Sequence, residues 1–236
     1  NKMSAKSSIK LLVPAQAQGT LYKWVAILTG SKNALKGVGF FLGGALLMWL
    51  GFAGAVAAMA ATLTLVWLSS LVLLKQDLGK AKNKPKFRDI FSKSRAINIL
   101  SAARMFLFGA RDVWFVVALP VFLSQTLGWN HSQTGGFLAL WVIGYGMVQA
   151  LAPRITGSKG GKAAGKVPDG RAATGWAALS MLLPGLIALG LMFELNPATV
   201  LIGGLLLFGV VFAINSSLHS YLIVSYAGSD GVSLDV

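Results

Sequence analysis

Four cationic side chains lie inside apolar segments that are long enough to cross a membrane: Lys32 and Lys36 in one segment, Arg104 and Arg111 in another. Spacings of four and seven residues place the two members of each pair on one face of a helix. A charge at the centre of a bilayer costs at least about 2.5–3.5 kcal/mol on insertion scales, so such residues usually serve a function. Guanidinium groups bind phosphate-like oxyanions in bidentate fashion, and ammonium groups act as point charges. The two pairs therefore predict an anion-binding site within the membrane.

Two alternatives stay open for these cations. They can be structural, pairing with carboxylates, or they can extend along the helix to the membrane surface. Asp112 is the one acidic residue deep in an apolar segment, and it directly follows Arg111. Neighbouring side chains on a helix point about 100° apart, so we expect no simple ion pair between these two residues. Asp112 is interpreted as a proton-coupling carboxylate or as the partner of a lysine on another helix.

A polar strip in the last apolar segment adds three further candidates. Asn215, Ser216 and His219 share one helical face and are expected either to hydrogen-bond a substrate or to bridge helices. Histidine is also the side chain that titrates near neutral pH. A second stripe, at i, i+4 spacing, consists of Trp141, Tyr145 and Gln149, for which we expect packing at Trp141 and leave Gln149 open.

The composition is that of an all-α polytopic membrane protein. Of 236 residues, 55% are hydrophobic and 12% are charged, against about 25% charged in soluble domains. The net charge of +14 does not indicate nucleic-acid binding, because the cations gather in loops on one predicted side of the membrane.

Six spans are expected, at about 21–50, 53–74, 97–127, 134–152, 174–193 and 198–226. The segments 1–20, 75–96 and 154–173 are basic, whereas the short turns between the other spans lack Lys and Arg, so the basic segments are predicted to be cytoplasmic. A GxxxG motif, Gly39–Gly43, permits close helix contact in the first span. Pro153 is expected to end the fourth span, and residues 232–236 to begin a further helix.

Catalytic and cofactor sites are not predicted. The chain has no cysteine and two histidines, and its Gly/Lys-rich stretch at 157–166 lacks the Ser or Thr of a phosphate-binding loop. We therefore expect no enzyme, no metal and no cofactor, and transport driven by a gradient rather than by ATP.

Four long segments carry a family resemblance. They are NKMSAKSSIKLLVP (1–14), LTGSKNALKGVGFFLGGALL (28–47), KPKFRDIFSKSRAINILSAARMFLFGARDVWFVVALPVFL (84–123) and GGFLALWVIGYGMVQALAPR (135–154). In these segments the chain resembles the organoarsenical efflux permeases (ArsJ type) of arsenic-resistance operons, which belong to the major facilitator superfamily. The resemblance implies a partial bundle: 21–74 as two helices of the N-terminal half, 75–96 as the loop between the halves, and 97–236 as helices of the C-terminal half. It also implies an internal fragment that lacks the first and the last spans.

The resemblance further implies a substrate and a functional partner. Glyceraldehyde phosphate dehydrogenase accepts arsenate in place of phosphate, and the permease exports the resulting arseno-phosphoglycerate across the cytoplasmic (inner) membrane. Lys32, Lys36, Arg104, Arg111, Asn215 and His219 are then the expected substrate contacts. A general transporter of sugar phosphates or other organophosphates is the alternative within the same class of protein. A non-transporting membrane protein that binds anionic lipid is the alternative of a different class.

Overall fold

The computed structural model describes residues 6, 9, 10, 12–14, 16–73, 94–157 and 167–227, and these are helical apart from short connections. The helices are α2 (Gln18–Leu73), α3 (Arg95–Asp112), the π-helix η2 (Val113–Ala118), α4 (Leu119–Gln125), α5 (His131–Ile155), α6 (Gly170–Met192) and α7 (Pro197–Tyr226). Most of the two basic loops, and the expected helix at 232–236, lie outside the described residues. Five helical stretches in the described part are long and apolar enough to cross a membrane. The expectation of an all-α membrane protein is confirmed to that extent.

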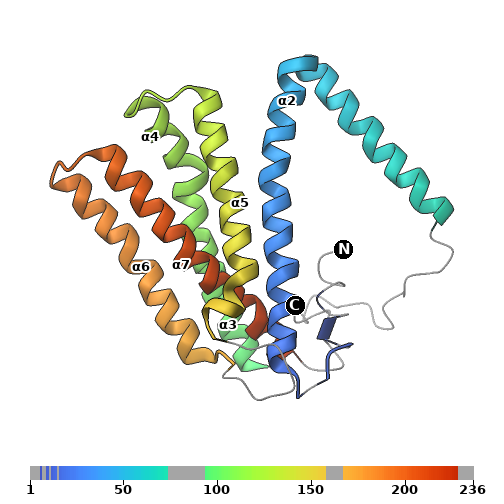
Figure 1. Cartoon of the computed structure of the whole chain (residues 1–236), viewed down its shortest axis with the longest axis vertical. Helices are drawn as coiled ribbons and strands as arrows, with labels where there is room; N and C mark the ends of the chain where they lie inside the picture. The colour runs from blue at the N-terminus through green and yellow to red at the C-terminus, as the bar shows by residue number, and fades with distance from the viewer. Residues whose placement is uncertain are drawn as a thin grey trace.

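The first two predicted spans form one helix with a sharp bend. At 56 residues, α2 measures about 84 Å at 1.5 Å per residue, more than twice the hydrocarbon thickness. Gly51 breaks it, with φ 65° and ψ −178°, a conformation that is essentially restricted to glycine. The second arm turns back and stands apart from the other helices (Figure 1). Of the second arm, only Ala55 is buried.

Short turns at one end of the bundle reverse the chain. The Gly51 bend, the α4–α5 turn and the α6–α7 turn all lie at the upper end in Figure 1, as the prediction of one common side requires. Asn130 caps α5 with Gln133 in a reciprocal capping box, and Asn196 caps α7. The prediction that Pro153 ends its span is wrong by a few residues: α5 runs through Pro153 to Ile155. One lost hydrogen bond near a helix end is tolerated there.

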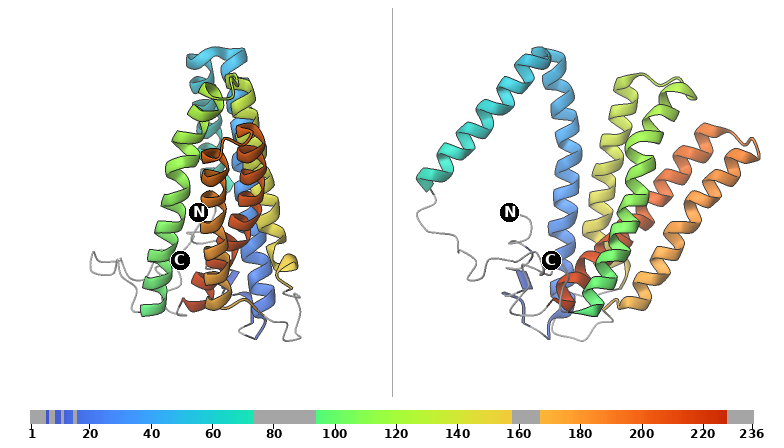
Figure 2. Two further views of the ribbon diagram at one scale, coloured as in Figure 1. Left: turned by 90° about the vertical axis from the view of Figure 1, so that its left-hand side faces the viewer. Right: turned by 180° about the vertical axis from the view of Figure 1, so that it is seen from behind.

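The third span is a single stretch with a π-helical middle. Residues 95–125 run through α3, η2 and α4 without a break, and the right-hand view of Figure 2 shows them in front of α5 and α7. Pro120 has no N–H to donate to the residue four positions earlier, and the wider π turn ends two residues before it. The π-helix begins one residue after Asp112, so the change in helix geometry adjoins the charged pair.

α7 is the central helix of the bundle. All fourteen residues from Val211 to Val224 are buried, as expected for a helix that is apolar nearly all round. One core cluster joins its lower half to α2, α5 and α6 through Tyr22, Ala152, Ala173 and Tyr221. A second cluster joins its middle to α5 and α6 through Trp141 and Phe212. Polar side chains in this stretch therefore face other helices rather than lipid.

Small residues bring α2 and α5 together. A Cβ added at Gly30 would meet the backbone of Gly146 and Ala150, and one at Gly37 would meet Ala139 O at 2.8 Å. Backbones this close are typical of small-residue contacts between membrane helices. The GxxxG at Gly39 and Gly43 is not that contact, because both positions face open space. The close contact is made by Gly30 and Gly37, which lie on another face of the helix.

Candidate anion-binding site

Arg104 and Arg111 lie on one face of α3, as their spacing predicts, and both approach the ring of Phe108. The guanidinium carbons are 5.2 and 5.0 Å from its centroid, so they lie within about 10 Å of each other. Cations over an aromatic face are attracted by the ring quadrupole, by about 0.5–2 kcal/mol each. The rings thus hold both guanidiniums in place without neutralising their charge.

Arg111 forms an ion pair with its neighbour, and the prediction that the two residues do not pair is wrong. Its Nε donates to Asp112 Oδ1 at 2.8 Å, and its Nη2 contacts the same oxygen. The helical angle between adjacent residues is overcome because the arginine side chain is long enough to fold back along the surface. The carboxylate is half exposed and the guanidinium is not. Among the described residues this is the one ion pair that brings a carboxylate to either arginine.

Aromatic residues of α7 complete the surroundings of Arg111. Its guanidinium lies 5.2 Å from the ring centroid of Phe212, which packs edge-on against Phe108 at 5.4 Å. A pocket of about 290 Å³ opens beside it between α3, η2, α6 and α7. Its lining includes Arg111, Trp114, Ser180, Phe208 and Phe212, so a single cation faces an otherwise largely apolar hollow. A desolvated guanidinium in such a hollow binds anions more strongly than one in water.

The polar strip of α7 divides between two neighbouring helices. Asn215, Ser216 and His219 are all buried, with exposed fractions of 0%, 0% and 5%. Asn215 Nδ2 donates to Ser180 Oγ of α6 at 3.4 Å. Ser216 turns to α5 instead and is a bridge between helices, the second of its two expected roles. His219 lies within electrostatic range of Arg104, which brings a third predicted residue to the arginine face of the bundle.

A chain of hydrogen bonds crosses three helices on the other side of α7. Asn33 Nδ2 donates to Gln149 Oε1 at 2.6 Å, Gln149 Nε2 donates to Ser216 Oγ at 2.6 Å, and the Tyr145 hydroxyl lies 2.5 Å from the same oxygen. Trp141 is buried and donates to the Leu205 carbonyl at 2.9 Å, as the packing expectation requires. Gln149, left open by the sequence, is a structural bridge.

Lys32 and Lys36 are not gathered with the arginines. Both are exposed on α2, and by helical rotation they lie more than a quarter turn from the face of Gly30 and Gly37 that packs on α5. The structure therefore does not bring all four cations together in one site. Arg104 and Arg111 of α3 lie toward α7, with His219 of α7 within electrostatic range of Arg104. Asn215 faces α6 instead, and the lysines occupy an exposed face of α2.

Sequence reasoning missed two polar residues that form hydrogen bonds between helices. Asn33 lies between the two lysines in the sequence, and Ser180 is a lone hydroxyl in the apolar middle of α6. A polar residue in an apolar segment was the available signal, but the partners come from other helices. No group of three or more side chains able to hold a metal ion occurs among the described residues.

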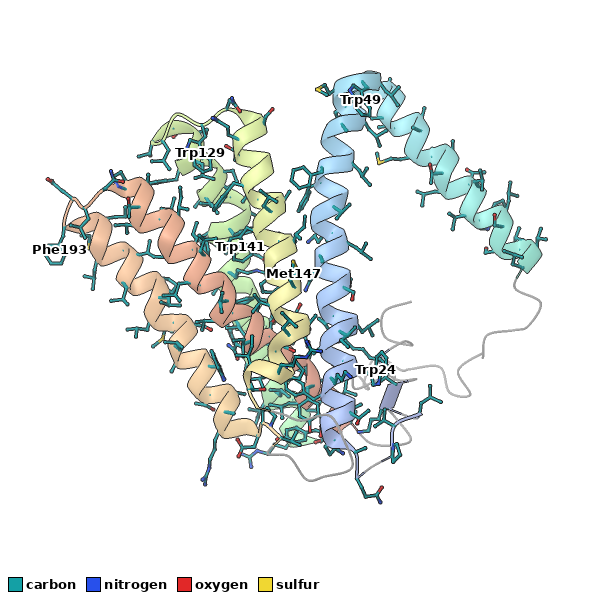
Figure 3. All side chains as sticks on the ribbon, viewed as in Figure 1. Trp24, Trp49, Trp129, Trp141, Met147 and Phe193 are labelled. Atoms are coloured by element: carbon teal, nitrogen blue, oxygen red, sulfur yellow. The ribbon has the colours of Figure 1, made fainter. Side chains whose placement is uncertain are left out.

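Three tryptophans lie near the two ends of the helices, as aromatic side chains do at the two surfaces of a membrane. Figure 3 places Trp24 toward the lower end of α2, and Trp49 and Trp129 near the upper end of the bundle.

Comparison with known proteins returned no match: no protein-family model, no curated protein and no solved structure is similar to this chain. The resemblance to organoarsenical permeases stays a prediction.

Proposed function

We propose that this chain is part of a secondary active transporter of the major facilitator type that exports an organic oxyanion across the cytoplasmic membrane. The observation that carries the proposal is the arginine pair on α3. Two guanidiniums lie within about 10 Å of each other on a membrane-length helix, and one half-exposed carboxylate, that of Asp112, contacts Arg111. Two partly buried cations at membrane depth with so little countercharge are costly to maintain, and an anionic ligand offsets that cost.

The position of the pair supports transport rather than surface binding. Arg111 is the seventeenth residue of the 31-residue stretch 95–125, which puts it at the middle of a span. Transporters place their substrates near the bilayer midplane. A protein that binds lipid head groups would hold its cations at the ends of its helices. The depth of Arg111 therefore favours the transporter over the lipid-binding alternative.

The cargo proposed is an arseno-phosphoglycerate, and the resemblance is the reason for that choice. The site itself supports a broader class, since guanidiniums bind phosphate and arsenate esters by the same bidentate geometry. A sugar phosphate or another organophosphate remains the alternative cargo. Transport experiments distinguish it from the arseno-phosphoglycerate.

The test is arsenic accumulation in arsenate-sensitive cells that express the gene encoding this chain, with and without glyceraldehyde phosphate dehydrogenase. Lower accumulation only with the dehydrogenase supports export of the arsenylated ester. Lower accumulation without it indicates an inorganic oxyanion as cargo. No change in either case contradicts arsenical export and leaves organophosphate transport to be measured directly.

Arg111→Ala is the matched perturbation, and Arg154→Ala is its control. Arg154 is an exposed arginine at the end of α5, outside the pocket. We expect Arg111→Ala to abolish export while membrane insertion stays normal, and Arg154→Ala to export like the wild type. Unchanged export by a stably inserted Arg111→Ala protein would contradict the role of the pocket.

A further inference from the structure

The pocket beside Arg111 is lined mainly by apolar side chains, several of which are large rings. Trp114 of η2, Pro184 of α6 and Phe208 of α7 all contribute to its wall. Its volume of about 290 Å³ is roughly twice that of an apolar cavity of about 150 Å³ that holds benzene. The pocket is therefore large enough for an aromatic ring with a small charged group beside it.

Hydrogen-bond donors are few in this wall. Among the described residues that line the pocket, Arg111 is the one charged side chain, and Trp114 adds an indole N–H. Ser180 Oγ donates its single proton to the Trp176 carbonyl at 2.8 Å, so it has none left for a ligand. Each further oxygen of a ligand would lose water in this pocket without gaining a donor. The wall therefore suits a ligand with one oxyanion and an apolar remainder.

The exposed part of the pocket lies in the middle of the apolar helices. Met181 lines the pocket, is 77% exposed and is the twelfth residue of the 23-residue α6. Ala110 of α3 also lines the pocket and is exposed. An apolar group can reach such an opening from the hydrocarbon phase, whereas a fully hydrated anion enters that phase only at high cost.

We propose that the pocket beside Arg111 binds small aromatic acids, with the oxyanion paired to the guanidinium and the ring in the apolar hollow. A bound aromatic acid occupies the same guanidinium as the transported anion and so competes with it. The competition rests on the proposed function, whereas the binding of the aromatic acid requires no transport.

The experiment compares benzoate with acetate, which has the same charged group but no ring, and with benzyl alcohol, which has the ring but no charge. Binding to the purified chain in detergent is measured by calorimetry, with empty micelles as the blank. The wild type should bind benzoate about tenfold more tightly than acetate, because the ring leaves water. Arg111→Met should reduce the affinity for benzoate to that for benzyl alcohol. Benzoate should also displace 3-phosphoglycerate, a stable analogue of the proposed cargo.

A variant that fills the pocket tests where the ring binds. Ala110→Leu should lower the affinity for benzoate to that for acetate, because the larger side chain takes the space of the ring. Ala103→Leu is the matched control: position 103 is exposed on the same helix, outside the lining, and this variant should bind like the wild type. Ala177→Leu fills the pocket from α6 and replaces Ala110→Leu if that variant does not fold.

Equal affinities of the wild type for benzoate and acetate, or benzoate binding that the filling variants leave unaltered, would overturn the inference. Benzoate that binds without displacing 3-phosphoglycerate would overturn the competition. If 3-phosphoglycerate binds and benzoate does not, the inference fails alone. If no anion binds the wild type, the proposed anion site fails with it.

Discussion

Asp112→Asn should strengthen anion binding, which is the opposite of what loss of a charged site residue usually does. Asp112 contacts the guanidinium of Arg111 through Nε at 2.8 Å and through Nη2, and so occupies the donors that an oxyanion would use. Asparagine keeps the size and one acceptor but removes the charge. The variant thus removes the negative charge that competes with a bound anion for Arg111.

The size of the effect follows from the exposure of the pair. The Asp112 side chain is 50% exposed and that of Arg111 is 18% exposed, so the pair is screened and contributes up to about 1 kcal/mol. An anion competing for the same guanidinium regains that free energy in the variant. Binding should therefore tighten by about two- to fivefold.

The assay is titration of the purified wild type and variant with 3-phosphoglycerate at low ionic strength, followed by calorimetry. Asp169→Asn serves as the charge control, since Asp169 caps α6 through Ala172 N, and asparagine caps about equally well. The control should bind like the wild type. Unchanged or weaker binding by Asp112→Asn would refute the view that this carboxylate competes with the ligand for Arg111.

Three further predictions follow from the packing. Gly37→Leu should lower the melting temperature in detergent, because the leucine side chain would collide with Ile143. Gly39→Leu is the control and should leave the melting temperature unchanged, because position 39 faces open space. Equal melting temperatures of the two variants would contradict the α2–α5 contact. Lys10→Met should speed amide hydrogen exchange in the last turn of α7. The Lys10 ammonium donates hydrogen bonds to the carbonyls of Val224 and Ser225 at 2.7 and 2.9 Å and so stabilises this helix end. Unaltered exchange in the variant would contradict that role. Lys36→Met should leave 3-phosphoglycerate affinity within about twofold of the wild type, since Lys36 lies apart from the arginine pocket, and a larger loss would bring it back into the site.

Local signals were sufficient for the apolar spans and for most of their ends, with Pro153 as an exception. The apolar runs are long enough to define each crossing, and Asn130 and Asn196 at the turns are ordinary capping residues. The shared face of Arg104 and Arg111 follows from a seven-residue spacing, because helical geometry alone fixes it. These features depend on a few neighbouring residues and on no other part of the chain.

Contacts between helices could not be predicted from the sequence in the same way. The motif at Gly39 and the contact at Gly37 look alike in sequence, and only the position of α5 decides which glycine is used. Ser216 and Asn215 are adjacent, yet they face α5 and α6 respectively. The ion pair of Arg111 depends on how a long side chain folds back, which a helical wheel does not describe.

The most direct test of the central claim is uptake of labelled 3-phosphoglycerate into inside-out membrane vesicles that contain this chain. The wild type and Arg104→Met/Arg111→Met should be compared at equal protein in the membrane. The account predicts gradient-dependent uptake by the wild type and background uptake by the double variant. Equal uptake by both proteins would contradict the claim that the arginine pair on α3 binds the transported anion.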